Sequence, residues 1–117
     1  MANLLDDAAR RRADRQHRLA TKRAEDEARR EQARALARER RLDQLASEEE
    51  AAWSRVDALI AARKPGEYDA AVTLLTDLQA LAERDDRDDT FALRTIALRQ
   101  THARKPSLIE RLNQAGI

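Results

Sequence analysis

Residues 42–60 read LDQLASEEEAAWSRVDALI, and this stretch decides the fold. Its apolar side chains recur at alternating intervals of three and four residues, which gathers them on one face of an α-helix. The stripe follows Leu42, Leu45, Glu49, Ala52, Val56 and Leu59, and Ala46, Trp53 and Ile60 widen it. We therefore expect a helix that packs this face against neighbours. Heptad spacing over fewer than three repeats, with Glu49 on the seam, indicates a coiled coil only weakly.

A second helix is predicted to follow this stretch. The sequence Arg-Lys-Pro-Gly at residues 63–66 closes the first helix, because Pro65 disfavours helical backbone at the residue before it. Glu67 then supplies negative charge to the first turn of the next helix. The apolar face of that helix consists of Tyr68, Ala71, Val72, Leu74, Leu75, Leu78, Leu81 and Ala82. A stripe this broad is typical of a helix buried against two neighbours.

Two shorter helices complete the predicted bundle. The acidic run 85–89 connects to a third helix, which Asp88 or Asp89 can cap. Ser107 and Glu110 have the spacing of a capping box, so a fourth helix is expected to begin there, and Gly116 is a natural stop. The apolar residues assigned to these two helices are Phe91, Leu93, Ile96, Ala97 and Leu98, followed by Leu108, Ile109, Leu112 and Ala115.

The predicted fold is all-α, with a long charged N-terminal helix leading into a small antiparallel bundle of three to four helices. The bundle covers residues 42–117, and a charged, Arg/Ala-rich helical arm covers residues 1–41. The residues expected to anchor the core are Trp53, Val56, Ile60, Tyr68, Leu75, Leu78, Phe91, Leu98 and Leu112. Trp53, Tyr68 and Phe91 are the only aromatic residues, one on each of the first three helices of the bundle. We expect them to anchor the core where those helices meet, and the alternative is a surface on which a base or a peptide stacks.

The segment before Leu42 differs in kind from the bundle. Neither Gly nor Pro occurs before Pro65, so nothing in the sequence requires a helix to break between the arm and residue 62. Between residues 13 and 37 nearly every apolar position is alanine, which buries too little area to hold a partner tightly. The sequence therefore predicts one long helix whose first part is exposed.

The net charge of +1 conceals a segregation of charge. Residues 10–41 contain thirteen basic and six acidic residues, a net charge of +7, whereas residues 42–117 contain ten and fourteen, a net charge of −4. An asymmetry of this kind suggests an anionic partner for the arm. The candidate nucleic-acid or anion contacts are Arg10, Arg11, Arg12, Arg15, Arg18, Lys22, Arg23, Arg29, Arg30 and Arg34.

A simpler interpretation of the same charges remains open. Acidic residues precede basic ones by four positions in the pairs Asp7–Arg11, Asp14–Arg18, Glu25–Arg29 and Asp26–Arg30. Pairs with this spacing and order stabilise a solvated helix by about 0.2–0.5 kcal/mol each. The arm can therefore be a helix supported by its own surface pairs.

Several classes of protein are disfavoured by composition. The chain has no cysteine and only two histidines, His17 and His102, so we expect no disulfide, no metal site and no cofactor. The acidic run 85–89 lacks the glycine and glutamate of a calcium loop, and two glycines cannot build a phosphate loop. No apolar run is long enough to span a membrane, and the first residues do not form a signal peptide. A soluble, cytoplasmic protein that is not an enzyme is predicted.

The C-terminal segment resembles a known family. Three stretches carry the resemblance: WSRVDALI at residues 53–60, YDAAVTLLTDL at residues 68–78 and HARKPSLIERL at residues 102–112. Residues 50–117 are similar to the C-terminal helical tail of actinobacterial proteins with a SWIM-type zinc finger. The resemblance implies a helical accessory module. Since that finger needs cysteines, which this chain lacks, zinc binding is not implied.

The predicted function is a non-enzymatic protein-interaction or accessory module. Its expected partner is another protein or a second copy of the chain, and neither a membrane nor a small-molecule substrate is expected. The alternative is sequence-nonspecific nucleic-acid binding through the basic arm, by phosphate contacts, because the arm contains no aromatic side chain on which bases could stack.

Overall fold

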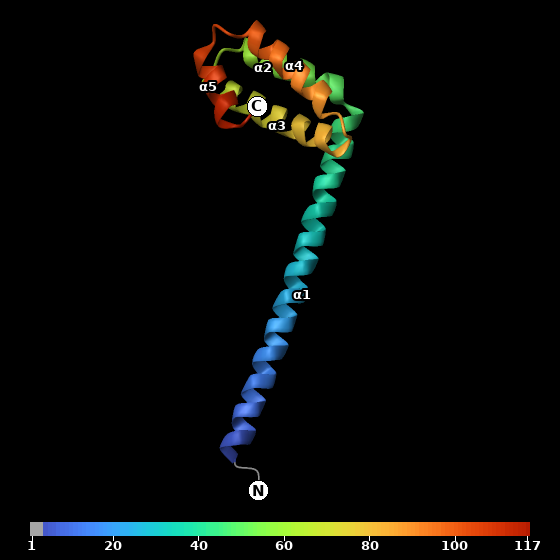
Figure 1. Ribbon diagram of the computed structural model, residues 1–117, viewed down its shortest axis with the longest axis vertical. Coiled ribbons are helices and arrows are strands. Elements are labelled where there is room, and N and C mark those ends of the chain that lie inside the picture. The colour runs from blue at the N-terminus through green and yellow to red at the C-terminus, as the bar shows by residue number, and fades with distance from the viewer. Residues whose placement is uncertain (1–3) are drawn as a thin grey trace. The chain divides into compact units, whose positions relative to one another are not determined.

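The computed structural model describes residues 4–117, and every regular element in them is an α-helix (Figure 1). The helices are α1 (Leu4–Ser47), α2 (Glu49–Ala61), α3 (Pro65–Arg84), α4 (Asp88–Thr101) and α5 (Pro106–Gln114). This confirms the predicted all-α fold, with a long charged N-terminal helix followed by a small helical bundle. Within the described residues no helix is long and apolar enough to cross a membrane.

The chain divides into two units, Met1–Glu39 and Arg40–Ile117. The division falls two residues before the boundary expected from the sequence. From here on, the arm is residues 4–39 and the body is residues 40–117. The arm is helical because it contains neither Gly nor Pro and is rich in Ala, Arg and Glu, which favour helix. None of its side chains is buried.

The first helix does not continue to residue 62, as the absence of Gly and Pro had suggested. It ends at Ser47, and Glu48 leaves the helical conformation with φ −126° and ψ 25° before α2 begins. The hydroxyl of Ser47 donates to the carbonyl of Gln44 at 2.6 Å, a local bond that competes with helix continuation. A break here allows α2 to turn its buried face, with Trp53, Val56 and Ile60, onto the core of the body.

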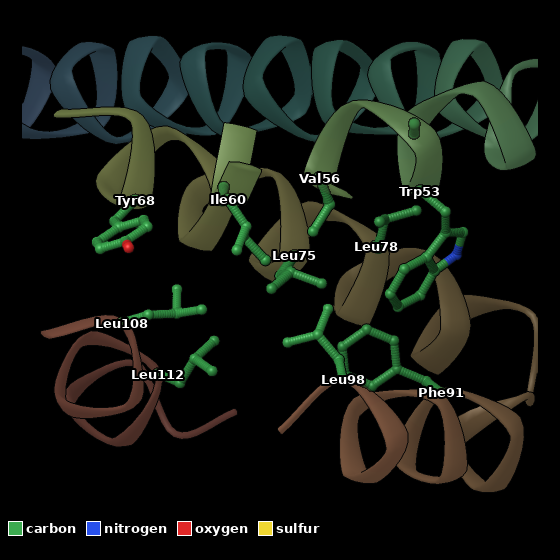
Figure 2. Close-up of a cluster of buried hydrophobic side chains, with 12 residues drawn as sticks. Trp53, Val56, Ile60, Tyr68, Leu75, Leu78, Phe91, Leu98, Leu108 and Leu112 are labelled. Carbon is green, nitrogen blue, oxygen red and sulfur yellow. The ribbon is translucent and has the colours of Figure 1, made fainter. Parts of the chain in front are cut away.

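The body is built around α3, which contacts α2, α4 and α5. Neighbouring helices run in opposite directions from α2 to α3 and from α3 to α4 (Figure 1). The buried cluster combines residues of all four helices (Figure 2). Its members are Ala52, Trp53, Val56, Ile60, Tyr68, Ala71, Leu75, Leu78, Phe91, Leu98, Leu108 and Leu112. All nine predicted core anchors are among them.

Two predicted caps are wrong. The residue before α4 is Arg87, and Asp88 and Asp89 lie in the first turn, where their charges favour the helix end without capping it. The residue before α5 is Lys105, and Ser107 lies one position inside the helix behind Pro106. The hydroxyl of Ser107 therefore accepts a hydrogen bond from the Arg111 side chain, and not the capping hydrogen bond from a backbone N–H group. Proline at the first helical position sets the start of both α3 and α5.

The orientation of α4 also differs from the prediction. Phe91 and Leu98 are buried, but Ile96 and Leu93 are 51% and 69% exposed. Thr95 takes the place predicted for an apolar side chain, and its hydroxyl donates to the carbonyl of Ala92 at 2.9 Å. Since this bond satisfies the hydroxyl, Thr95 can be buried, and α4 turns two large apolar side chains outward.

Candidate interaction surfaces

Arginine side chains join the helices of the body at its surface. Four salt bridges connect residues far apart in sequence: Arg84–Asp43 at 2.7 Å, Arg87–Glu49 at 3.1 Å, Arg94–Glu50 at 2.9 Å and Arg111–Asp69 at 2.7 Å. Arg99 adds hydrogen bonds to the Asn113 side chain and to the carbonyl of Ile117. These groups hold helices together, and Glu49, Arg87 and Arg94 also line a small pocket beside Trp53 and Phe91. Sequence patterns missed them, because no local spacing marks a pair forty residues apart.

The aromatic residues are part of the core and do not form a stacking surface. Trp53 is only 6% exposed, and its ring lies 5.9 Å from that of Phe91 at an angle of 46°. The guanidinium group of Arg94 lies over one face of the Trp53 ring. Tyr68 is also buried, but it lies at the other end of the cluster (Figure 2), so only two of the three aromatic residues meet.

Several titratable groups in the body have structural partners. The hydrogen bonds from Arg94 lower the pKa of Glu50. Desolvation, followed by the charge of Lys105, lowers the pKa of His102, whose Nδ1 lies 2.8 Å from the Lys105 ammonium group. Across residues 4–117, no group of three or more acidic or histidine side chains is placed to hold a metal ion.

Two places on the body expose apolar side chains. On α4, Leu93 and Ile96 lie one turn apart on the outer face, with exposed Ala97 beside them. Between α2 and α3, a shallow groove contains half-buried Leu59 and Leu74. The α4 row is the more exposed of the two. The sequence revealed its residues but assigned them to the core.

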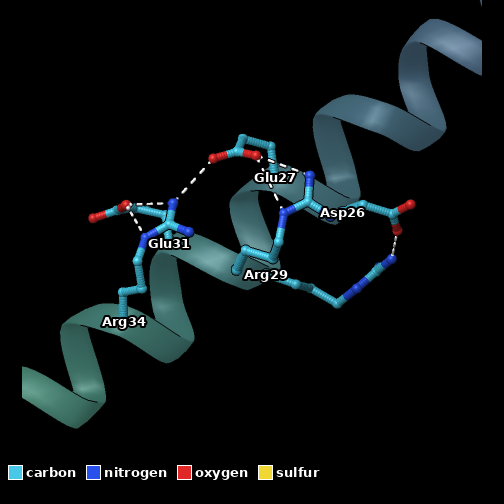
Figure 3. Close-up of polar contacts among 6 residues, drawn as sticks. Asp26, Glu27, Arg29, Glu31 and Arg34 are labelled. Atoms are coloured by element: carbon cyan, nitrogen blue, oxygen red, sulfur yellow. Dashed lines mark hydrogen bonds and ion pairs between the residues drawn. The ribbon is translucent and has the colours of Figure 1, made fainter.

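The second half of the arm neutralises its own charge. Residues 24–39 contain four basic and five acidic residues, a net charge of −1. Salt bridges join Asp26 to Arg29, Glu27 to Arg30 and Arg34, and Glu31 to Arg34 (Figure 3). A further salt bridge joins Glu31 to Arg38. Hydrogen bonds from Arg34 and Arg38 lower the pKa of Glu31. In this half, the predicted pairs Glu25–Arg29 and Asp26–Arg30 are therefore replaced by pairs at spacings of three and seven.

The first half of the arm carries most of the basic charge. Residues 10–23 contain seven basic residues and a single acid, Asp14, a net charge of +6. Exposed side chains of this half are Arg10, Arg11, Arg12, Arg15, Arg18, Lys22 and Arg23. The other three predicted anion contacts, Arg29, Arg30 and Arg34, belong to the salt-bridged half. The ten candidates are thus divided into an engaged group of three and an open group of seven, which form no salt bridge within the described residues. Two of the open group, Arg11 and Arg23, donate hydrogen bonds to backbone carbonyls one turn earlier in their own helix.

Four of the open group share one face of the helix. Arg11, Arg15, Arg18 and Lys22 follow one another at intervals of four, three and four residues, which places them within an arc of about 60°. In the part of the chain that the structure describes, no carboxylate forms a salt bridge with these four. Together with Ala8, Arg12 and Asp14, the three arginines line an open hollow on the arm. We call these four residues the basic row.

Comparisons of the chain with protein-family models, with curated proteins and with solved structures found no match. The similarity of residues 50–117 to the helical tail of SWIM-type zinc finger proteins therefore stays a prediction.

Proposed function

We propose that the body is a protein-interaction module whose docking surface is the outer face of α4. The observation that carries this proposal is the exposure of Leu93 and Ile96, at 69% and 51%, beside a core that is already filled. Large apolar side chains one turn apart are the anchors with which a helix engages an apolar groove on a partner. Burying them in an interface would contribute about 1–2 kcal/mol each.

The surroundings of this row support binding more than chemistry. Asp89 precedes Leu93 by one turn, and Gln100 follows Ile96 by one turn, so polar side chains border the apolar pair. An apolar centre with a polar rim is the usual anatomy of a protein interface. Four arginines of the body are engaged with carboxylates of other helices, in pairs such as Arg94–Glu50. A helical accessory module is also what the SWIM-type resemblance implies.

The test compares two doubly substituted chains that lose equal numbers of exposed apolar residues. One carries Leu93→Gln with Ile96→Gln, and the control carries Leu19→Gln with Leu36→Gln on the arm, where both leucines are more than half exposed. Glutamine preserves helix propensity at all four positions. Proteins cross-linked to the immobilised chain are quantified, and light scattering over a concentration series detects a second copy as the partner.

We expect the α4 variant to capture at least about tenfold less of its partner, or to self-associate at least about tenfold more weakly. The arm variant should behave like the unmodified chain in both measurements. Thermal unfolding must be unchanged in the α4 variant, because neither residue is in the core. If the α4 variant and the unmodified chain retain the same partners to the same extent, α4 is not the docking surface.

A further inference from the structure

We infer that residues 10–23 of the arm bind the phosphate backbone of double-stranded DNA without sequence preference. This site lies outside the body and is independent of the function proposed for α4. The two halves of the arm have the same helical structure but opposite charge balance, +6 in residues 10–23 and −1 in residues 24–39. A ligand attracted by charge therefore has one place on the arm to bind.

The arrangement of the basic row fits a polyanion with regularly spaced charges. From Arg11 to Lys22 the row rises about 16 Å along the helix, with a positive charge every 4.5–6 Å or so. Three of its four members are arginines, whose planar guanidinium groups bind phosphate oxygens in pairs. Flanking Arg10, Arg12 and Arg23 extend the positive surface around the helix. Such a helix can contact a phosphate strand along three turns.

The form of the nucleic acid follows from what the arm lacks. Single-strand binding relies on aromatic side chains that stack on bases, and the chain's three aromatic residues are all buried in the body. Duplex RNA offers a major groove too deep and narrow for side chains to use, whereas that of B-form DNA is about 12 Å wide and admits an α-helix. Contacts limited to phosphates carry no sequence information. B-form DNA of any sequence is the ligand that fits.

A membrane surface fits less well. Helices that lie in the lipid interface bury an apolar face opposite their basic face. Leu19 is the one large apolar residue between residues 6 and 35, and its neighbours on the helix surface include Arg15, Lys22 and Arg23. Burying Leu19 in lipid would draw these charges toward the hydrocarbon. The opposite side of this half presents only small or polar side chains, including Ala13, Ala20 and His17.

The experiment uses the full chain and follows fluorescence anisotropy of labelled 20-base-pair DNA duplexes of two unrelated sequences between 50 and 200 mM salt. The row variant replaces Arg11, Arg15, Arg18 and Lys22 with glutamine. The control variant replaces Arg29, Arg30, Arg34 and Arg38 with glutamine, which removes the same net charge from the salt-bridged half. A third variant, with Arg11, Arg15 and Arg18 replaced by lysine, keeps the charge of the row. Far-UV circular dichroism verifies that all variants stay helical.

Each phosphate contact steepens the dependence of log affinity on log salt by about 0.9. We therefore expect the unmodified chain to lose at least about 100-fold in affinity between 50 and 200 mM salt. In the row variant, the slope of log affinity against log salt should be smaller in magnitude by about 3–4, and in the control variant by less than about 1. The lysine variant should keep most of the slope, and the two duplex sequences should bind equally.

Four results would overturn the inference. The first is no binding at 50 mM salt, and the second is an equal loss in the row and control variants. The third is single-stranded DNA bound as tightly as the duplex. The fourth is tighter binding of polyglutamate or of vesicles containing phosphatidylserine, which would assign the row to an acidic protein or to a membrane.

Discussion

The guanidinium group of Arg94 on α4 lies over the ring of Trp53 on α2, with 4.2 Å between its central carbon and the ring centroid. The same group donates hydrogen bonds to both carboxylate oxygens of Glu50, at 2.9 and 3.2 Å. These hydrogen bonds, opposed by desolvation, raise the pKa of Arg94. One side chain thus joins α4 to α2 and covers the only tryptophan of the chain.

Replacing Arg94 with glutamine should lower the free energy of unfolding of the body by about 1 kcal/mol, because a cation–π contact and an exposed ion pair are lost together. Urea unfolding followed by Trp53 fluorescence measures the change, and the emission of the folded variant should shift to longer wavelength. Arg104→Gln, in the exposed connection between α4 and α5, is the matched control. Equal effects of the two substitutions would show that the Arg94 contact contributes nothing specific.

The stability of the body should fall strongly when a buried side chain of α3 is truncated, and only weakly when a side chain on the outer face of α4 is truncated. Leu75 is fully buried at the centre of the cluster, so Leu75→Ala should cost about 2–5 kcal/mol of unfolding free energy. Leu93→Ala removes the same atoms from a side chain that is 69% exposed, and should change the free energy of unfolding by less than about 0.5 kcal/mol. Chemical denaturation of both variants compares them directly. A large loss of unfolding free energy in Leu93→Ala would mean that α4 turns its Leu93 side toward the core.

The stability of the body should decrease slightly as pH falls below neutrality because of His102. Burial and the charge of Lys105 lower the pKa of its imidazole below the ordinary value of 6.5. The folded state then binds fewer protons than the unfolded state, so the stabilising contribution is complete above pH of about 6.5 and is lost as pH falls through the folded pKa. Proton NMR titration of His102 should give the lowered value, and Lys105→Ala should raise it. An unshifted His102 would contradict the packing of the α4–α5 connection.

Much of the body could be predicted from sequence because its apolar stripes are broad. The face of α3, from Tyr68 to Leu81, is buried as its spacing predicts. On α4 the stripe is ambiguous: Phe91, Leu98, Leu93 and Ile96 surround the helix, and burial of Thr95 decides which side faces inward. Only the competition between packed neighbours settles such a choice. The break at Glu48 also depends on the packing of α2 onto the core, because no Gly or Pro in the sequence marks it.

The candidate surfaces show a similar limit. Sequence identified the basic segment as a whole, and ten of its side chains, from Arg10 to Arg34, as candidate anion contacts. It could not separate the basic row from the engaged arginines, because pairs at several spacings are sterically possible on a helix. Side-chain positions in the structure, such as those of Glu27 and Glu31 between two arginines each, make that separation.

The most direct measurement is amide hydrogen exchange along the intact chain. If the body is held by its own core and the arm only by its own side chains, amides of α3 exchange through global unfolding, whereas arm amides exchange through local helix opening. We expect amides of residues 10–38 to exchange at least about 100-fold faster than those of Leu75 and Leu78. Equal protection of the arm and α3 would contradict the division into an open helix and a packed body.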